Sequence, residues 1–91
     1  MQIAVRLPTH LDLYTAGERS LLLTLAADAC LRDALEAVEA RHPGLRFRIV
    51  DEQGAIRRHI KIFVGNTPAT GLAQALADGE TVMVVAALSG G

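Results

Sequence analysis

Side chains that commonly carry enzyme chemistry are few in this 91-residue chain and are scattered along it. There is one cysteine, Cys30, and the three histidines, His10, His42 and His59, show neither metal-site spacing nor the spacing of a histidine–carboxylate pair. A single cysteine excludes an internal disulfide and any zinc or iron–sulfur site built on the cysteines of one chain. The sequence also lacks a P-loop for nucleotide phosphates. We therefore expect a protein that is not an enzyme, with no catalytic residue, no metal and no cofactor bound by the chain itself.

The end of the chain, Ser89-Gly90-Gly91, remains as the candidate for chemistry. Its two glycines lack Cβ atoms and can therefore pass a channel that is too narrow for other residues. Residues 88–91 reach at most roughly 13–14 Å when extended, so they can carry the terminal carboxylate into a buried site of a partner. A free carboxylate is a poor electrophile and would need activation there. A terminal glycine pair is also typical of a frayed chain end, so its meaning depends on the fold that precedes it.

The periodicity of the apolar residues predicts the elements that precede this end. Strands are expected at 2–7, 18–25, 59–64 and 81–87, and an amphipathic helix at 31–41. Loops are expected at 9–17 and 65–68, and short helical turns at 45–50 and 71–76. Cys30 is expected to cap the helix or to be buried beside it, rather than to act as a reactive thiol.

Two hairpins that flank one helix can bury that helix against a mixed sheet. The first and last strands are then parallel and central, which is the β-grasp arrangement. We expect an α+β fold with a sheet of four to five strands packed on one main helix. The chain is long enough for one domain, which we place at 1–87, followed by a flexible tail at 88–91.

The alternation within the strands separates the expected core from the expected surface. Val82 and Val84 are expected in the core. The side chains expected on the outer face of the sheet are Ala4, Phe63, Met83 and Val85. An exposed apolar patch of this kind, with Leu88 at its edge, is typical of a surface that docks partner proteins. The alternative is that loops of the chain itself cover these side chains.

The composition excludes several classes of partner. The net charge of −1 and the three aromatic residues provide neither a basic field nor a stacking platform for nucleic acid. The apolar runs are much shorter than the ~20 residues of a membrane span, and the N-terminus lacks the layout of a signal peptide. We expect a cytoplasmic protein without nucleic-acid or membrane partners. A small basic cluster, Arg57, Arg58, His59 and Lys61, either pairs with an acidic partner surface or is a solvated hairpin.

The whole chain resembles the ubiquitin-like sulfur carriers. This family includes the small subunit of molybdopterin synthase, the carrier of the thiazole pathway and the carrier that feeds a cysteine synthase. The resemblance lies in the strand MQIAVRLPT, the helix CLRDALEAVEARHPGL, the segments DEQGAIRRHIKIFVGN and GLAQALADGETVMVV, and the terminal GG. The segment VRLPTHLDLYTAGERS is most similar to the cysteine-synthase branch.

The resemblance implies a function for Gly90 and Gly91. In the family, an adenylyltransferase/sulfurtransferase related to ubiquitin-activating enzymes uses ATP to adenylate the terminal carboxylate, which then becomes a thiocarboxylate. The sulfur passes to an acceptor such as a cysteine synthase or the large subunit of molybdopterin synthase. Two alternatives stay open: a ubiquitin-like modifier joined through Gly91 to lysines of other proteins, and a passive ubiquitin-like interaction domain.

Overall fold

The structure is a computed structural model that describes residues 1–86. A long helix separates two groups of strands, and shorter helical segments lie on either side of it. The elements are β1 (Gln2–Arg6), η1 (Thr9–Leu11), α1 (Asp12–Thr15), β2 (Ser20–Thr24), α2 (Leu31–Arg41), α3 (Leu45–Ile49), β3 (Ile60–Val64), β4 (Thr67–Pro68) and β5 (Thr81–Ala86).

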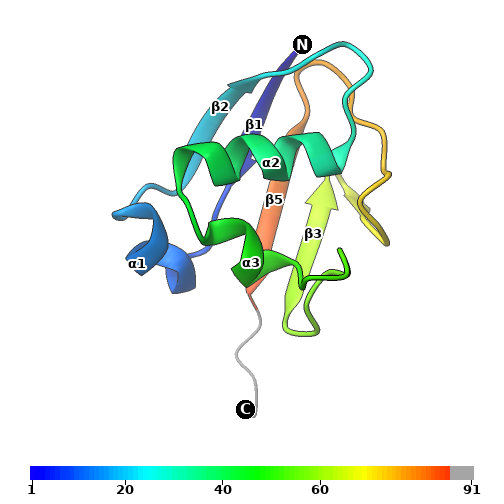
Figure 1. Cartoon of the computed structure of the whole chain (residues 1–91). Coiled ribbons are helices and arrows are strands. Elements are labelled where there is room, and N and C mark those ends of the chain that lie inside the picture. Colours follow the sequence, from blue (N-terminus) through cyan, green and yellow to red (C-terminus); the bar gives the residue numbers. More distant parts are fainter. Residues whose placement is uncertain (87–91) are drawn as a thin grey trace.

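The strands form one mixed sheet in the order β2-β1-β5-β3-β4. β1 and β5 run parallel, and every other pair of neighbours is antiparallel. α2 lies across one face of the sheet, and α1 and α3 lie at the end of the molecule at which β5 finishes (Figure 1). The expected α+β fold, with five strands and with the first and last strands parallel inside the sheet, is confirmed.

One hydrophobic core fills the space between α2 and the sheet. The residues that α2 contributes are the stripe expected from its periodicity, Leu31, Ala34, Leu35 and Val38. The strands contribute the inward-facing residues Ile3, Val5, Leu21, Leu23, Ile60, Ile62, Val64, Val82 and Val84. Burial of one Val or Leu side chain contributes about 1.5–3 kcal/mol, so this apolar stripe is what holds α2 on the sheet.

Polar contacts fix both ends of α2. Cys30 is the N-cap residue, and its backbone N–H donates a hydrogen bond to Asp33 Oδ2 at 2.8 Å. This hydrogen bond holds the pKa of Asp33 below its usual value. At the other end, Nε2 of the C-cap residue His42 lies 2.7 Å from Glu18 Oε1. The expected structural role of Cys30 at the start of the helix is confirmed.

Residues 71–76 do not form the expected helical turn. The carbonyl groups of Leu72 and Gln74 instead accept hydrogen bonds from the N–H groups of Arg32 and Leu31, both at 2.9 Å. These donors lie in the first turn of α2, where N–H groups have no partner inside the helix. The prediction was wrong because α2 uses the carbonyl groups that a local helical turn would need.

Two expected loops also contain regular structure. Residues 9–17 include η1 and α1, and Arg19 Nη2 lies 2.8 Å from Asp12 Oδ2, which ties α1 to the start of β2. After β3, Gly65 adopts a φ of +60°, and the chain turns so that β4 pairs with β3. Pro68 indicated a break because proline cannot donate in a ladder, but a two-residue edge strand accommodates it.

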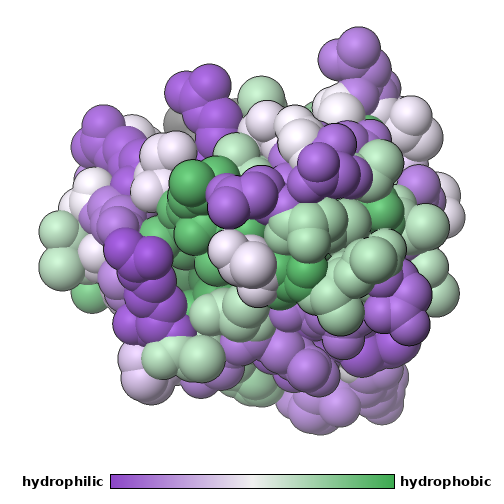
Figure 2. Space-filling view, turned by 90° about the horizontal axis from the view of Figure 1, so that it is seen from above, coloured by the Kyte–Doolittle hydropathy of each residue, from purple (hydrophilic) through white to green (hydrophobic). Residues whose placement is uncertain are grey.

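The end of the molecule that carries the N-terminus has a mixed surface. Figure 2 looks onto this end and shows an apolar area bordered by hydrophilic groups. The N-terminal ammonium of Met1 donates to the carbonyl oxygen of Leu25 at 2.5 Å, which ties the start of the chain to the end of β2. Within residues 1–86, no helix has the length and apolar character needed to cross a bilayer.

Candidate functional site

The outer face of the sheet carries the apolar patch expected from the alternation of the strands. Met83 is 40% exposed and Val85 is 37% exposed, while Phe63 and Ala4 are half-buried. None of these four side chains belongs to the core between α2 and the sheet. Within residues 1–86, no loop covers Met83 and Val85, which argues against the alternative for these two side chains.

The register of the sheet brings the patch together around β5. Met83 lies opposite Phe63 of β3 and beside Arg6 of β1, and Val85 lies opposite Lys61 of β3. Directly opposite residues on one face have Cβ atoms about 4.5–5.5 Å apart, so these side chains are neighbours. Arg6 and Lys61 are both exposed. The patch therefore has an apolar middle with one cation on each side.

Leu22 extends this patch and was not anticipated from the sequence. It is 66% exposed and lies on β2 opposite Ala4, while Leu21 and Leu23 on either side of it are buried. Because three leucines follow one another, the residue types do not alternate, and the sequence does not show that Leu22 is the one that faces outward. We call Ala4, Leu22, Phe63, Met83 and Val85 the sheet patch.

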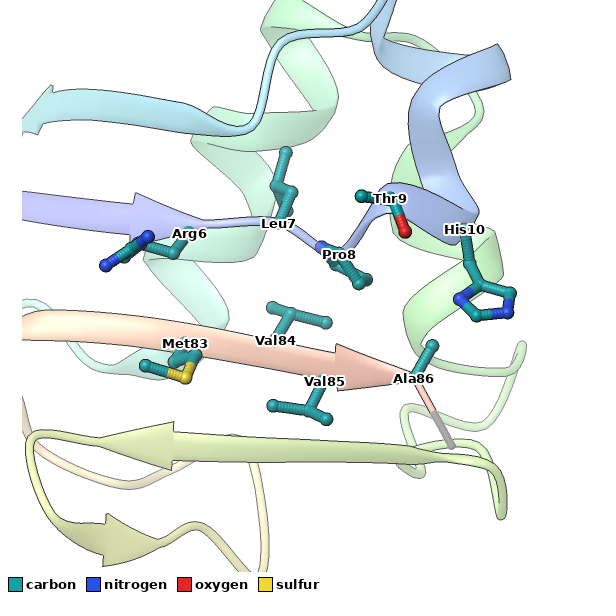
Figure 3. Close-up of a pocket in the computed structure, with 9 residues that line it drawn as sticks. All are labelled: Arg6, Leu7, Pro8, Thr9, His10, Met83, Val84, Val85 and Ala86. Carbon is teal, nitrogen blue, oxygen red and sulfur yellow. The ribbon is translucent and has the colours of Figure 1, made fainter. Parts of the chain in front are cut away.

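A shallow groove of about 430 Å³ lies beside the sheet patch, between the end of β1 and β5. Figure 3 shows Pro8 and His10 on one side of the groove and Met83 and Val85 along β5 on the other, with Ala86 at its end. The remaining lining residues are Arg6, Leu7, Thr9 and Val84. The groove thus lies where the chain leaves the central strand of the sheet.

The terminal residues expected to carry the chemistry, Leu88, Ser89, Gly90 and Gly91, lie outside the described residues, as does Ala87. The last described residue, Ala86, is the final residue of β5. Since β5 lies between β1 and β3, the residues that follow it start next to the groove and the sheet patch. The structure therefore brings the expected docking residues to the place from which the terminal segment begins.

Lys61 is the single lysine of the chain, and it lies on β3 across from Val85. The other amine, the N-terminus, is hydrogen-bonded to the Leu25 carbonyl at the opposite end of the molecule (Figure 1). Neither Arg6 nor Lys61 forms an ion pair with another residue in the described part of the chain. Both are exposed cations at the border of the sheet patch.

The carboxylates with shifted pKa values serve the fold. Hydrogen bonds lower the pKa of Asp12, Asp33, Glu39 and Asp51, through the Arg19 side chain for Asp12 and through backbone N–H groups for the other three. None of these four residues lines the groove beside the sheet patch. Among residues 1–86, no three His, Cys, Asp or Glu side chains are grouped so that they could hold a metal ion. The docking role expected for the sheet patch, and the chemistry expected of the terminal segment, stay predictions at this point.

Comparison with known proteins places these features in context. No model of a protein family matches the chain. The sulfur carrier protein CysO of Mycobacterium tuberculosis is 31% identical over 96 residues, which cover 100% of both chains. Small archaeal modifier protein 1 of Haloferax volcanii is 33% identical over 76 residues, which cover 84% of this chain and 86% of that protein.

Solved structures agree with these sequence relatives. The crystal structure of the Haloferax volcanii modifier SAMP1 superposes with a TM-score of 0.85 at 27% identity and covers 100% of both chains. A chain of the BexX/CysO complex of Amycolatopsis orientalis superposes with a TM-score of 0.82 at 32% identity, covering 98% of this chain and 99% of that one. The similarity extends over nearly the full length in each case.

Proposed function

Because the chain belongs to the family of ubiquitin-like sulfur carriers and small modifiers, we propose that it carries sulfur as a thiocarboxylate on Gly91. It acts as a protein co-substrate and not as an enzyme. The observation that supports this proposal most directly is the 31% identity to a sulfur carrier protein over the whole of both chains. We place the reaction in the cytoplasm, where ATP is available to the partner enzyme.

The proposed chemistry takes place on the terminal carboxylate. A carboxylate oxygen of Gly91 attacks the α-phosphorus of ATP in an adenylating partner, and pyrophosphate leaves. The acyl adenylate has lost the negative charge that protected the carbonyl carbon, and AMP is its leaving group. A sulfide ion (HS⁻) then attacks the carbonyl carbon, AMP leaves with the C–O bond that breaks, and loss of the remaining proton gives a terminal thiocarboxylate. The partner supplies the ATP site, and Gly90 and Gly91 allow the chain to enter it because they have no Cβ atoms.

The sheet patch supplies the affinity that the terminal segment cannot supply. Ordering each residue of a flexible chain costs about 1–2 kcal/mol, so residues 88–91 oppose binding when they enter a narrow channel. Exposed apolar side chains on a rigid sheet, Met83 and Val85 above all, gain free energy when a partner covers them. Met83 also adapts to different surfaces, which suits a carrier that meets an activating enzyme and a sulfur acceptor.

The sulfur acceptor is a biosynthetic enzyme. The candidates are an enzyme of the cysteine synthase type and the large subunit of molybdopterin synthase. Relatives named CysO support the first candidate, and one of them was solved in complex with a protein named BexX. The acceptor takes up the same terminal segment and covers the same sheet patch as the activating enzyme.

A second candidate function is protein modification. The 33% identity to small archaeal modifier protein 1 supports it. In this case the activated Gly91 carbonyl is attacked by a lysine amine of a target protein, AMP leaves and an isopeptide bond forms. Both functions need adenylation of Gly91 and differ in the nucleophile that displaces AMP.

Reconstitution with the adenylating enzyme encoded in the same genome tests this function. The chain, ATP and a sulfide donor are combined, and the mass of the intact chain is measured. We expect the mass to rise by the difference between sulfur and oxygen, and a variant lacking Gly90 and Gly91 to stay unchanged. A passive interaction domain would bind the enzyme equally well with and without the two glycines and would gain no mass.

A further inference from the structure

A row of stacked aromatic and guanidinium groups crosses the end of the molecule at which β5 finishes. The guanidinium carbon of Arg48 lies 4.5 Å from the centre of the Tyr14 ring. The guanidinium carbon of Arg57 lies 4.5 Å from the centre of the Phe47 ring. Each pair includes one residue of α3, Phe47 or Arg48, and we call the four residues of the two pairs the Arg–aromatic row. Its helices α1 and α3 lie beside the tip of β5 (Figure 1).

The side chains of the row are held in place before any partner binds. Arg57 Nε donates a hydrogen bond to the carbonyl oxygen of Phe47 at 2.7 Å. Each guanidinium also gains about 0.5–1 kcal/mol from the aromatic ring beneath it. A docked partner would therefore not have to immobilise these arginines, which normally costs about 0.5–1.5 kcal/mol for each side chain.

The positive charge of the row is not neutralised within residues 1–86. The ion pairs in this part of the chain join Arg19 to Asp12 and Glu18 to Arg41 and His42. Backbone hydrogen bonds, from the Ala55 N–H above all, lower the pKa of Asp51, and the charge of nearby Arg57 adds to this effect without forming an ion pair. Within these residues, the guanidinium of Arg48 and the two terminal nitrogens of Arg57 therefore make no ion pair and can bind carboxylates from outside.

Apolar side chains accompany these charges. Phe47 is 52% exposed, although it follows the buried Leu45 by only two residues. Leu13 on α1 is 94% exposed. Exposed apolar side chains together with ordered arginines match the composition of interface centres, in which aromatic residues and Arg are enriched.

We propose that the Arg–aromatic row docks an acidic, partly apolar surface of the adenylating enzyme that receives the terminal segment. This inference rests on the proposed function, because a partner that takes up the residues after Ala86 must approach this end of the molecule. Guanidinium groups pair with two carboxylate oxygens at once, which fixes the orientation of the partner. Phe47 and Leu13 then contact its apolar side chains.

Single-stranded RNA fits the row less well than an acidic protein does. RNA-binding surfaces use the open faces of aromatic rings to stack bases. Here an arginine already covers one face of both Tyr14 and Phe47. The net charge of −1 also gives no long-range attraction for a polyanion. The observations therefore favour a protein partner.

Adenylation kinetics of single variants test the row. The KM for the chain is measured by ATP–pyrophosphate exchange with the adenylating enzyme of the same genome. We expect Arg48→Glu to raise this KM about tenfold with little change in kcat, since removal of one partner of a docked ion pair mainly weakens binding. Phe47→Ala is also expected to raise KM. Added salt is expected to weaken the binding of the unchanged chain to the enzyme more than the binding of Arg48→Glu.

The matched control is Arg32→Glu. Arg32 is also an exposed helical arginine without an ion pair in the described residues, but it lies in the first turn of α2. If Arg48→Glu and Arg32→Glu give equal KM values and the unchanged chain is still adenylated, the docking role of the Arg–aromatic row is wrong and the proposed function is unaffected. Absence of exchange with the unchanged chain would contradict both. RNA binding can be measured from the fluorescence anisotropy of a labelled oligonucleotide. If Arg48→Glu weakens RNA binding and leaves the KM for adenylation unchanged, a protein is not the partner of the row.

Discussion

Met83 and Val84 are neighbours on β5 with opposite surroundings. Met83 is 40% exposed on the outer face, and Val84 is 2% exposed in the core. Both are apolar, so their types alone do not distinguish a docking residue from a core residue. The alternation along the strand does, because successive side chains point to opposite faces of a sheet.

A pair of alanine variants separates docking from stability at this position. Met83→Ala is expected to raise the KM for adenylation about tenfold, as removal of a central interface side chain does, and to leave the free energy of unfolding within about 0.5 kcal/mol. Val84→Ala is expected to lower the free energy of unfolding by about 2 kcal/mol and to keep the KM of the folded chain. Urea titration and pyrophosphate exchange measure the two effects. An unchanged KM for Met83→Ala would contradict the role of the sheet patch.

At the scale of elements, α2 positions α3. Gly44 precedes α3 with a φ of +95°, and its N–H donates to Glu39 Oε2 at 2.8 Å. The N–H of Arg46 donates to Glu39 Oε1 at 2.9 Å. A carboxylate from the third turn of α2 therefore satisfies donors at the N-terminus of α3, where a negative charge is also favourable. This contact places Phe47 and Arg48 on the surface.

The contact predicts a pH dependence of stability. The two backbone hydrogen bonds hold the pKa of Glu39 below its usual value of 4.5. A lowered carboxylate pKa stabilises the fold above the unfolded value, and this stabilisation is lost as the pH falls through the folded value. Glu39→Gln is expected to lower the free energy of unfolding by about 1 kcal/mol at neutral pH. At acidic pH the variant and the unchanged chain are expected to have nearly the same free energy of unfolding, because Glu39 is then protonated.

Glu36→Gln is the control on the same helix. Glu36 is exposed, and its side chain makes no hydrogen bond within residues 1–86. Urea titrations at several pH values should therefore give nearly the same curves for Glu36→Gln and the unchanged chain. A deficit of Glu39→Gln that persists unchanged below pH 4.5 would contradict the cap on α3.

The elements that could be predicted from the sequence are those whose apolar pattern reports on the core. The apolar patterns of β1, α2 and β5 identified their core-facing residues, and the arrangement of these elements could be predicted from them. The pattern at 71–76 did not, because the carbonyl groups of this segment bind the start of α2. Leu22 was hidden in a run of leucines. The Arg–aromatic row unites Tyr14, Arg48 and Arg57 from separate segments, which only the folded chain brings together.

At the scale of the whole molecule, α2 and the sheet share one hydrophobic core that supports the strand leading to the C-terminus. The start of β1 and the end of β5 lie at opposite ends of the sheet, because these two strands run parallel (Figure 1). The groove and the sheet patch lie along β5, and the Arg–aromatic row lies at the end of the molecule at which β5 finishes, so all three border the place from which the chain continues. A partner that covers this side can hold the body while the terminal glycines enter its site. The proposed carrier function therefore depends on whether Gly91 ends in a thiocarboxylate.

The most direct test is the state of the C-terminus in the cells that make the protein. No lysine or arginine follows Lys61, so trypsin releases residues 62–91 as one peptide. We predict that mass spectrometry of the untagged chain finds this peptide with one oxygen replaced by sulfur. The same peptide found only as a free carboxylate, or only joined to lysines of other proteins, would contradict the carrier function.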